Sequence, residues 1–349
     1  MNAYSDILAA SDTDRRGLFF TAAERLGTTI QNIEKDFWVC WTLTALFHGL
    51  PDDAPRLLFK GGTSLSKGYG LITRFSEDID ITVFRDDIGV TASAEDLEAK
   101  TKTGRRKQLD RIQRSCQDYI NGPLLKALGG LAADAMSAAG RHAGQMTVVP
   151  DREDADKQSL LIHYPGVTEH DGYIQPFIKI ESGAKSALDP HEQRRIAPYI
   201  ADDVPDGAAL TVGGVTTIDP QRTLLDKILI LHGLPIFFQK HGRLYGSGQV
   251  SRHYYDVHCL VDGGVAEKAC TDTVLVDDCI KHAQMFFYRK DTGLDEVARG
   301  RFRLMPADGM TDLLRRDYEA MARMIFGEVP AFESVLASAA KAEAWLNEA

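Results

Sequence analysis

The sequence predicts an α/β (α+β) fold, in which a lobe with a mixed, twisted sheet precedes a mainly helical C-terminal lobe. Short β-branched segments alternate with helical stretches in the first part of the chain, and from Asp219 onward the apolar pattern is mostly helical. The 349 residues also exceed one ordinary domain. We therefore expect an N-terminal domain over residues 1–205 and a C-terminal domain over 206–349, with the turn-rich segment 204–215 at the transition.

The N-terminal domain is expected to begin with helices that lead into a strand and a glycine turn. Residues 12–50 carry apolar side chains at three- and four-residue steps, which predicts helix. The segment 51–55 contains two prolines and ends that pattern. Residues 57–59 are apolar and enter Gly61-Gly62, so we expect a buried strand followed by a tight turn.

A short helix and a second strand should follow this turn. Residues 63–70 suit a short helix with Thr63 or Ser64 as its N-cap. Residues 79–84 alternate and are β-branched, which predicts a strand. Asp78 and Asp80 are two positions apart and therefore share one face of that strand.

The rest of the N-terminal domain is predicted to add one long helical region and three strands. The helical region covers residues 94–139 and is interrupted at 121–123, where the sequence reads Asn-Gly-Pro. The strands are expected at residues 145–149, 159–164 and 173–181.

Composition limits the classes of protein that fit. Hydrophobic residues make up 44% and charged residues 26%, which are ordinary globular values. A net charge of −10 excludes a uniformly basic nucleic-acid surface, so a polynucleotide would need a local basic patch.

Five irregularly spaced cysteines without a CxxC pair argue against a structural zinc site and for reduced thiols. With no signal peptide and no apolar run of membrane-span length, we expect a cytoplasmic protein without a membrane partner.

The paired aspartates and the glycine turn point to a metal-dependent reaction on phosphates. Asp78 and Asp80 could present two carboxylates to divalent cations, and Glu181 is the best candidate for a third. The turn at Gly61-Gly62 would let phosphates approach backbone N–H groups. Each motif alone also fits an ordinary turn or a solvated strand end. Their order, a strand, Gly-Gly-Thr-Ser, a short helix and a strand with Asp-x-Asp, favours the functional interpretation.

Several blocks in this order make the chain resemble the AbiEii/AbiGii toxin-type nucleotidyltransferases, a branch of the DNA polymerase β superfamily. The two most specific are Phe59–Lys67, which reads FKGGTSLSK, and Phe75–Asp80, which reads FSEDID. Four shorter blocks accompany them, at residues 33–39, 178–181, 223–228 and 252–257. The resemblance implies a nucleotidyltransferase lobe joined to a helical lobe, with the nucleotide between them.

The resemblance also implies roles for individual residues. Asp78 and Asp80 would bind metal and act in catalysis. Lys227 would direct its charge at the triphosphate, and Asp256 would orient Lys227 or a metal-bound water. The remaining expected site residues would bind the nucleotide: Gly61, Gly62, Thr63, Ser64, Lys67 and Ser76. Taken alone, Lys67 and Lys227 also fit plain solvated lysines, and Lys35 and Asp36 fit a tie between the N-terminal helices and the core.

The acceptor of the nucleotide is less defined by the sequence. Two basic clusters are compatible with an RNA end, because cations bind phosphates and aromatic rings stack on unpaired bases. The first contains Lys102, Arg105, Arg106, Lys107, Arg111 and Arg114; the second contains Arg289, Lys290, Arg299, Arg301 and Arg303 and follows Phe286, Phe287 and Tyr288. Both clusters fit equally well with solvated helix faces.

The favoured interpretation is an Mg²⁺- or Mn²⁺-dependent enzyme that moves NMP from an NTP to an RNA 3′ end, in particular of tRNA. It would act as the toxin of a toxin–antitoxin or abortive-infection system, with a cognate antitoxin as partner. Two alternatives stay open. The acceptor could be a protein hydroxyl, on the antitoxin or on the enzyme itself, that is nucleotidylated or phosphorylated. The chain could also be a nucleotide-binding regulator without turnover.

Overall fold

The computed structural model describes residues 2–169, 175–246 and 248–348. The chain forms two compact units. Unit 1 comprises Met1–Gly68, Phe75–Thr91 and Asp110–Thr217, and unit 2 comprises Tyr69–Arg74, Ala92–Leu109 and Ile218–Ala349. The main division therefore falls after residue 217 and not after the expected residue 205, and two short segments of the first half belong to unit 2.

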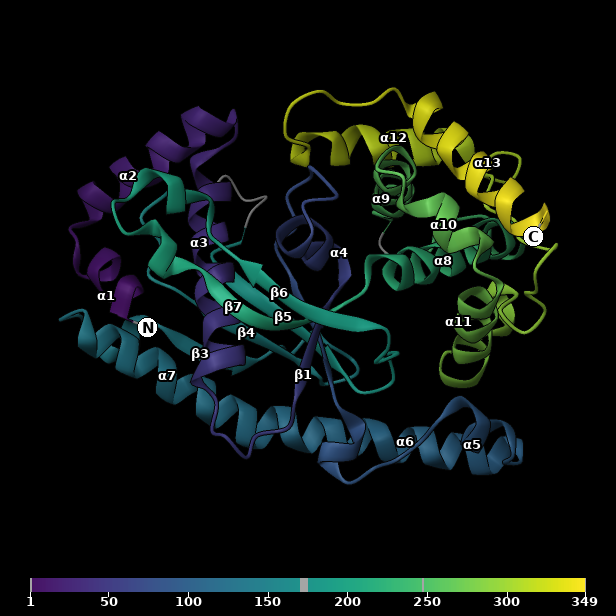
Figure 1. Ribbon diagram of the computed structural model, residues 1–349, viewed down its shortest axis with the longest axis horizontal. Helices are drawn as coiled ribbons and strands as arrows, with labels where there is room; N and C mark the ends of the chain where they lie inside the picture. Colours follow the sequence, from purple (N-terminus) through teal and green to yellow (C-terminus); the bar gives the residue numbers. More distant parts are fainter. Residues whose placement is uncertain (1, 170–174, 247, 349) are drawn as a thin grey trace. The chain divides into compact units, whose positions relative to one another are not determined.

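Unit 1 is built on one mixed sheet of seven strands in the order β3-β4-β5-β2-β1-β7-β6 (Figure 1). The strands are β1 (Leu57–Lys60), β2 (Ile79–Val83), β3 (Thr147–Pro150), β4 (Ser159–His163), β5 (Phe177–Gly183), β6 (His191–Ile196) and β7 (Val212–Ile218). β1 pairs antiparallel with β2 and parallel with β7, and β2 pairs parallel with β5. The mixed sheet that the sequence predicts is thus confirmed.

The central strands follow the expected alternation of faces. In β2, Ile79 and Ile81 are fully buried, whereas Asp80 between them is partly exposed. Because successive strand residues point to opposite faces, burial of the isoleucines turns the aspartate to the other side of the sheet. The alternation of apolar and polar residues in β2 is therefore enough to determine which face of the sheet the Asp80 carboxylate occupies.

Within the described part of the chain, five helices of eight or more residues belong wholly or partly to unit 1. They are α1 (Asn2–Ala9), α2 (Asp12–Leu26), α3 (Ile30–Thr44), α6 (Lys102–Tyr119) and α7 (Leu125–Ala138). The Thr29 side chain accepts a hydrogen bond from Asn32 N and caps α3, which packs against α2 and β5. Trp38 and Trp41 on α3 are almost fully buried, so this helix supplies much of the core beside the sheet.

The predicted break in the long helical region is confirmed. A π-helical turn at Ile120–Leu124 separates α6 from α7 and contains Pro123. Proline lacks an N–H group and cannot donate to the preceding turn, so the regular helix is interrupted here. α6 itself crosses the division between the units, since its residues up to Leu109 belong to unit 2.

Unit 2 is helical, as the sequence predicts. Its remaining helices are α5 (Ala94–Glu98), α8 (Pro220–His241), α9 (Ser251–Asp262), α10 (Val265–Thr271), α11 (Thr273–Phe286), α12 (Thr311–Met321) and α13 (Phe332–Glu348). Asp219 caps α8 through Gln221 N, and Pro220 occupies the first helical position, where its missing N–H costs no hydrogen bond. α9 packs against α8, α12 and α13.

Three strand predictions need correction. The segment 204–215 was expected to be turn-rich, yet residues from 212 form β7, where Gly213 and Gly214 hide the strand pattern. β6 was not predicted, because five of its six residues are polar or charged. The strand expected from residue 173 begins at Phe177; residues 173 and 174 lie outside the described part of the chain.

Two further expectations can be compared with the structure. The five cysteines, all within the described residues, carry free thiols, as predicted. Across the described helices, we find none that combines the length and apolar character needed to cross a bilayer.

Candidate active site

A row of charged side chains crosses the centre of the sheet in unit 1. Asp80 on β2 is paired in register with Lys60 on β1 and with Glu181 on β5. Residues directly opposite each other in a sheet point to the same face, so these three side chains share one surface. Lys60 Nζ lies 3.8 Å from Asp80 Oδ1. Asp78, two residues before Asp80, adds a second carboxylate beside this row.

The glycine turn and Asp80 are in direct contact. Gly61 has a φ of +78°, and a Cβ added there would lie 2.0 Å from Asp80 Oδ2. No other residue type could occupy this position without moving the carboxylate, because both the backbone conformation and the space exclude a side chain. The predicted proximity of the glycines to the paired aspartates is therefore present in the structure.

Thr63 holds the segment that carries the first aspartate. Its Oγ1 lies 2.5 Å from the backbone oxygen of Asp78 and 2.8 Å from Ser76 Oγ. Ser64 Oγ donates to Gly61 O at 2.9 Å, which closes the turn from within. Thr63 and Ser64 are fully buried. Their hydroxyl groups, which were expected to hold phosphates, are thus engaged inside the protein, and both residues shape the site.

Negative charge is concentrated around Asp78. Burial raises the pKa of Asp78 to about 7, and the nearby carboxylates of Glu77, Glu181 and Asp80 add to the shift, while Lys35 opposes it. Lys35 forms an ion pair with Glu77 and also donates to the backbone oxygen of Gln175 at 3.2 Å. A carboxyl group whose charge is so poorly compensated fits a position that a cation would occupy.

Fewer carboxylates than expected are available to a metal ion beside the glycine turn. Among the described residues, no three His, Cys, Asp or Glu side chains converge closely enough to hold a metal ion together. The expected third ligand, Glu181, instead pairs with Lys179, with Glu181 Oε1 3.0 Å from Lys179 Nζ. Lys179 Nζ also lies 3.3 Å from Asp151 Oδ2. Two carboxylates remain, which suits Mg²⁺ because this ion commonly keeps several waters and binds substrate phosphates.

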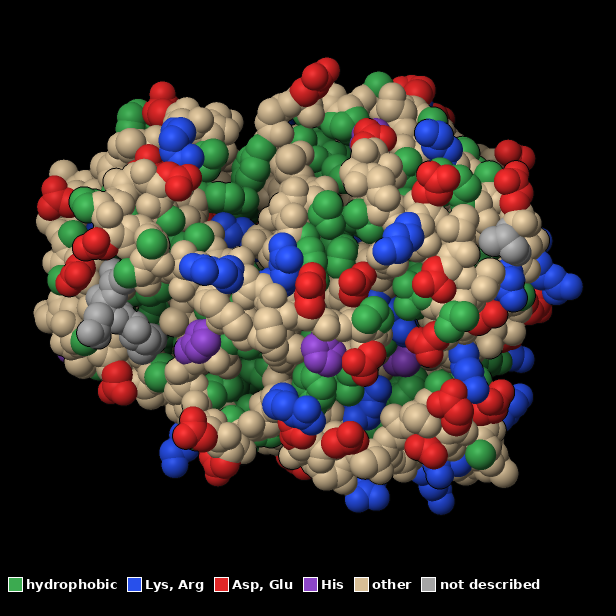
Figure 2. All heavy atoms as spheres, in the orientation of Figure 1, with side chains coloured by type: hydrophobic (Ala, Val, Ile, Leu, Met, Phe, Trp, Pro, Cys, Tyr) green, Lys and Arg blue, Asp and Glu red, His purple; other side chains and the backbone are tan. Residues whose placement is uncertain are grey.

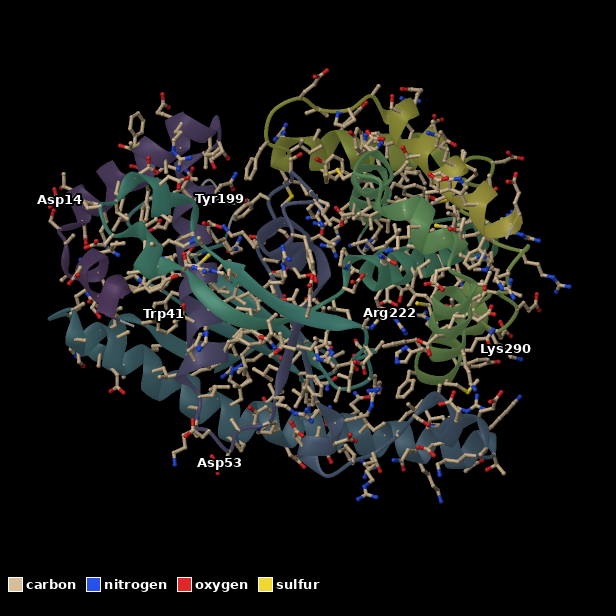
Figure 3. All side chains as sticks on the ribbon, viewed as in Figure 1. Asp14, Trp41, Asp53, Tyr199, Arg222 and Lys290 are labelled. Atoms are coloured by element: carbon tan, nitrogen blue, oxygen red, sulfur yellow. The ribbon has the colours of Figure 1, made fainter. Side chains whose placement is uncertain are left out.

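Lys67, which was expected to bind the nucleotide, forms a buried ion pair in the structure. Its side chain is only 6% exposed, and its Nζ lies 2.6 Å from Asp36 Oδ1. The ring of Tyr199, labelled in Figure 3, covers the ammonium group at 3.6 Å from its centroid. Asp36 Oδ2 also accepts a hydrogen bond from Tyr199 N at 2.6 Å. Lys67 therefore connects the turn after β1 to α3.

Lys227 and Asp256 form an ion pair within unit 2. Lys227 Nζ lies 2.8 Å from Asp256 Oδ2, and Arg74 Nε lies 2.7 Å from Asp256 Oδ1. Asp256 is fully buried, yet these two cations hold its pKa well below the usual range. Lys227 and Asp256 are thus in contact, and the role of Asp256 in orienting Lys227 stays a prediction. Arg74 was missed, since nothing in its sequence context distinguishes it from a surface arginine.

The two basic clusters differ in how far their charges are compensated. On α6, Lys102, Arg106, Lys107, Arg111 and Arg114 are exposed. In the second cluster, Arg289 pairs with Asp291 and Arg299 pairs with Asp277, whereas Arg301 and Arg303 line a cavity described below. Figure 2 shows basic and acidic side chains interspersed over the visible face, which agrees with the net charge of −10.

Comparison with known proteins agrees with this geometry. The fold and the carboxylate pair beside a glycine turn define the class of nucleotidyltransferases. The family model of the nucleotidyl transferase AbiEii toxin of type IV toxin–antitoxin systems matches residues 44–338, and the chain belongs to this family. The chain is therefore a nucleotidyltransferase.

Similarity to individual proteins is limited to the fold. MenT4, a nucleotidyltransferase toxin from Mycobacterium tuberculosis H37Rv, superposes with a TM-score of 0.50 over 96% of this chain and 90% of that chain, at 15% identity. No curated protein matches the sequence.

Proposed function

We propose that this nucleotidyltransferase uses Mg²⁺ to transfer NMP from an NTP to the 3′ hydroxyl of an RNA, with tRNA as the acceptor to test first. The observation that carries the proposal is the position of Asp80 on β2, in direct contact with the turn at Gly61, with Asp78 directly before the strand. Carboxylates beside a turn without side chains can serve a metal ion and the phosphates that it binds.

In the proposed reaction, the oxygen of the 3′ hydroxyl group loses its proton to water and attacks the α-phosphorus of the NTP. A new O–P bond forms, the bond to the β-phosphate oxygen breaks, and pyrophosphate leaves. Asp78 and Asp80 would bind Mg²⁺, which when bound polarises the triphosphate and stabilises charge on the attacking and leaving oxygens. Thr63 would keep Asp78 in place, Gly61 and Gly62 would admit the phosphates, and Mn²⁺ would replace Mg²⁺ with the same ligands.

Lys227 and Asp256 are proposed to assist from unit 2. Lysine suits a triphosphate as a point-charge partner. Asp256 would fix the Lys227 ammonium group, to which it is already paired. The Lys227→Met variant should lose transfer activity even at temperatures at which it is still folded. Full activity in that variant would remove Lys227 from the catalytic group.

The acceptor is tested by incubating the protein with Mg²⁺, total tRNA and each of the four NTPs. Label from the α-phosphate should appear on RNA, and label from the γ-phosphate should not. Absence of RNA label with all four NTPs would reject the RNA acceptor. Label on protein would support a hydroxyl of the antitoxin or of the enzyme as acceptor, and γ-label there would indicate phosphorylation.

Asp78→Asn and Asp80→Asn variants separate an enzyme from a nucleotide-binding regulator. Each change removes a negative charge that the metal needs, so transfer should fall at least about a hundredfold while the fold is retained. A regulator without turnover would show no transfer in the unchanged protein either, and its nucleotide binding would remain the property to measure.

A further inference from the structure

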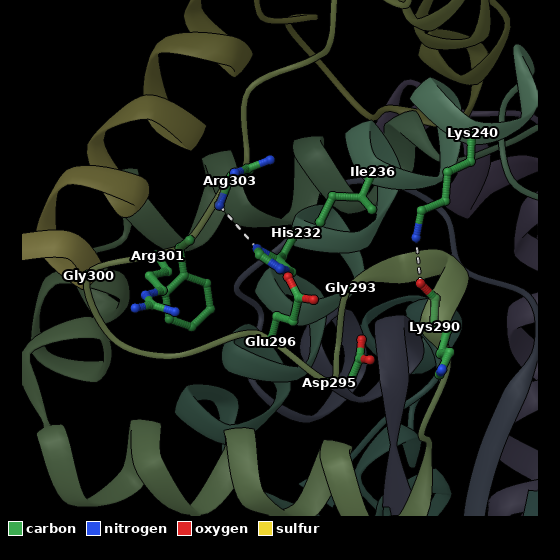
Figure 4. A pocket seen from close by; sticks show the side chains of 11 residues that line it. His232, Ile236, Lys240, Lys290, Gly293, Asp295, Glu296, Gly300, Arg301 and Arg303 are labelled. Carbon is green, nitrogen blue, oxygen red and sulfur yellow. Dashed lines mark hydrogen bonds between the residues drawn. The ribbon is translucent and has the colours of Figure 1, made fainter.

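Unit 2 contains a cavity of about 900 Å³ that none of the predicted catalytic residues lines. One wall is the C-terminal half of α8, with His232, Ile236 and Lys240, and the other is formed by residues of the segment 290–303 (Figure 4). The volume lies in the range of pockets that bind small molecules and cofactors.

The lining is rich in cations that have no carboxylate partner. Four basic side chains contribute to it: Lys240, Lys290, Arg301 and Arg303. Among the described residues, none of them forms a salt bridge, in contrast to the nearby pairs Arg289–Asp291 and Arg299–Asp277. The protein has 50 acidic and 40 basic residues, so a cluster of basic side chains without acidic partners is unusual for its composition. Such a cluster favours the binding of an anionic ligand.

The wall that carries the two arginines is held in place by hydrogen bonds. Phe302 N donates to Asn347 Oδ1 at 2.8 Å, and Asn347 Nδ2 donates to Phe302 O at 3.1 Å. Arg303 N donates to His232 Nδ1 at 3.1 Å, and Leu304 N donates to Glu343 Oε2 at 2.5 Å. Phe302 is buried, whereas its neighbours Arg301 and Arg303 are exposed. The hydrogen bonds therefore hold the stretch of backbone that carries the two arginines.

His232 adds no charge to the cavity at neutral pH. Burial and the nearby Arg303 lower the pKa of His232 to about 4. The lining also contains the carboxylates of Asp295 and Glu296, drawn in Figure 4 on the same stretch of chain. The cavity therefore combines four cations with two hydrogen-bond acceptors for hydroxyl groups.

We propose that this cavity is a second ligand site, which binds a phosphate-bearing ribonucleotide, either free or within an RNA chain. Guanidinium groups bind phosphate oxygens in bidentate fashion, which suits Arg301 and Arg303. Asp295 and Glu296 can accept hydrogen bonds from ribose hydroxyls. The lining contains neither Asp78 nor Asp80, so binding at this site can be measured apart from the transfer reaction.

Binding is tested by calorimetry with ATP in EDTA, so that no metal supports triphosphate binding at the carboxylate pair. Asp78→Asn/Asp80→Asn should bind ATP as the unchanged protein does. Arg301→Gln/Arg303→Gln should bind it about tenfold more weakly, because two charge-assisted contacts are lost. The matched control Arg316→Gln/Lys341→Gln removes two exposed charges of unit 2 elsewhere and should have no effect.

The source of the phosphate is identified by competition. If a short single-stranded RNA displaces ATP and a DNA of the same sequence does so less well, the natural ligand is an RNA chain. If only mononucleotides displace ATP, it is a free nucleotide. Asp295→Asn/Glu296→Gln should reduce the preference for ATP over dATP while strengthening binding of tripolyphosphate, because two repelling charges are removed.

Unchanged ATP binding in Arg301→Gln/Arg303→Gln would overturn the proposal, as would equal weakening in the control. Lys240→Gln/Lys290→Gln provides an independent pair on the same cavity and should also weaken binding. If only one of the two double variants weakens ATP binding and the other binds ATP as the control does, the cavity does not act as a single site. Because binding is measured without metal, failure of the transfer assay would not affect this test.

Discussion

Gly61 is the residue at which backbone conformation and catalytic geometry depend most directly on each other. Gly61→Ala should lower transfer activity by at least about tenfold, because its Cβ would displace the Asp80 carboxylate. The change also costs about 1–2 kcal/mol of strain at a positive φ. Gly89→Ala is the matched control in unit 1, with a φ of +72° and open space around the added Cβ. Equal activity loss in both variants would contradict the prediction.

Thr63 is expected to act by positioning Asp78. Thr63→Val keeps the shape and removes the hydroxyl group, which should lower both kcat and stability, the latter by about 1–3 kcal/mol. Thr63→Ser should restore most of the activity because it restores the contact with Asp78 O. Activity and unfolding in urea are measured side by side. If Thr63→Ser is as inactive as Thr63→Val, the hydroxyl group does not explain the effect.

His232 is expected to make the stability of unit 2 depend on pH. In the unfolded chain its pKa is near 6.5, and in the folded protein it is about 4. The unfolded state therefore binds more protons between these values, and stability falls as the pH is lowered through this window, by up to about 3 kcal/mol. Unfolding free energies at pH 7 and pH 4 should differ less in His232→Gln. An unchanged difference would show that this histidine does not titrate as described.

At the scale of elements, the contact between α3 and the turn after β1 depends on one buried ion pair. Asp36→Asn should destabilise the protein by about 3 kcal/mol or more, because Lys67 would be left buried without its partner. Asp36→Leu/Lys67→Met removes both charges and should recover much of that loss.

The same double variant tests the role of Lys67. If Lys67 is structural, the variant should bind NTP as the unchanged protein does, as measured by calorimetry with Mg²⁺ present. A loss of NTP binding without a loss of stability would restore the original assignment of Lys67 to the nucleotide.

The elements that the sequence predicts well are those whose signal is local. Two-residue alternation in β2 placed Asp80 on the face opposite the buried Ile79 and Ile81, and the proline at residue 123 marked the break before α7. β6 was missed because a polar edge strand lacks an apolar pattern, and its place is set by its neighbours in the sheet.

Site residues whose role depends on distant partners were harder to predict. Lys67 pairs with Asp36 on another element. Arg74 reaches Asp256 across 182 positions of sequence. Such pairings follow from tertiary packing, which spacing along the chain does not encode.

At the scale of the whole molecule, membership of a toxin family predicts an effect on growth. Expression of the unchanged chain should slow growth of a bacterial host, and Asp78→Asn/Asp80→Asn should relieve this effect at equal protein level. The reason is that the carboxylate pair carries the charge needed for transfer. Growth curves and immunoblots provide the measurement. Equal inhibition by the double variant would show that toxicity does not require turnover.

The division of the chain into units has a consequence for dissection of the protein. The backbone passes from one unit to the other five times, after residues 68, 74, 91, 109 and 217. A fragment that stops at residue 217 would keep Arg74 but lose Asp256, its partner in unit 2. Because two segments of unit 2 precede residue 217, no single cut, whether by a protease or by a stop codon, can release unit 2 with all of its parts.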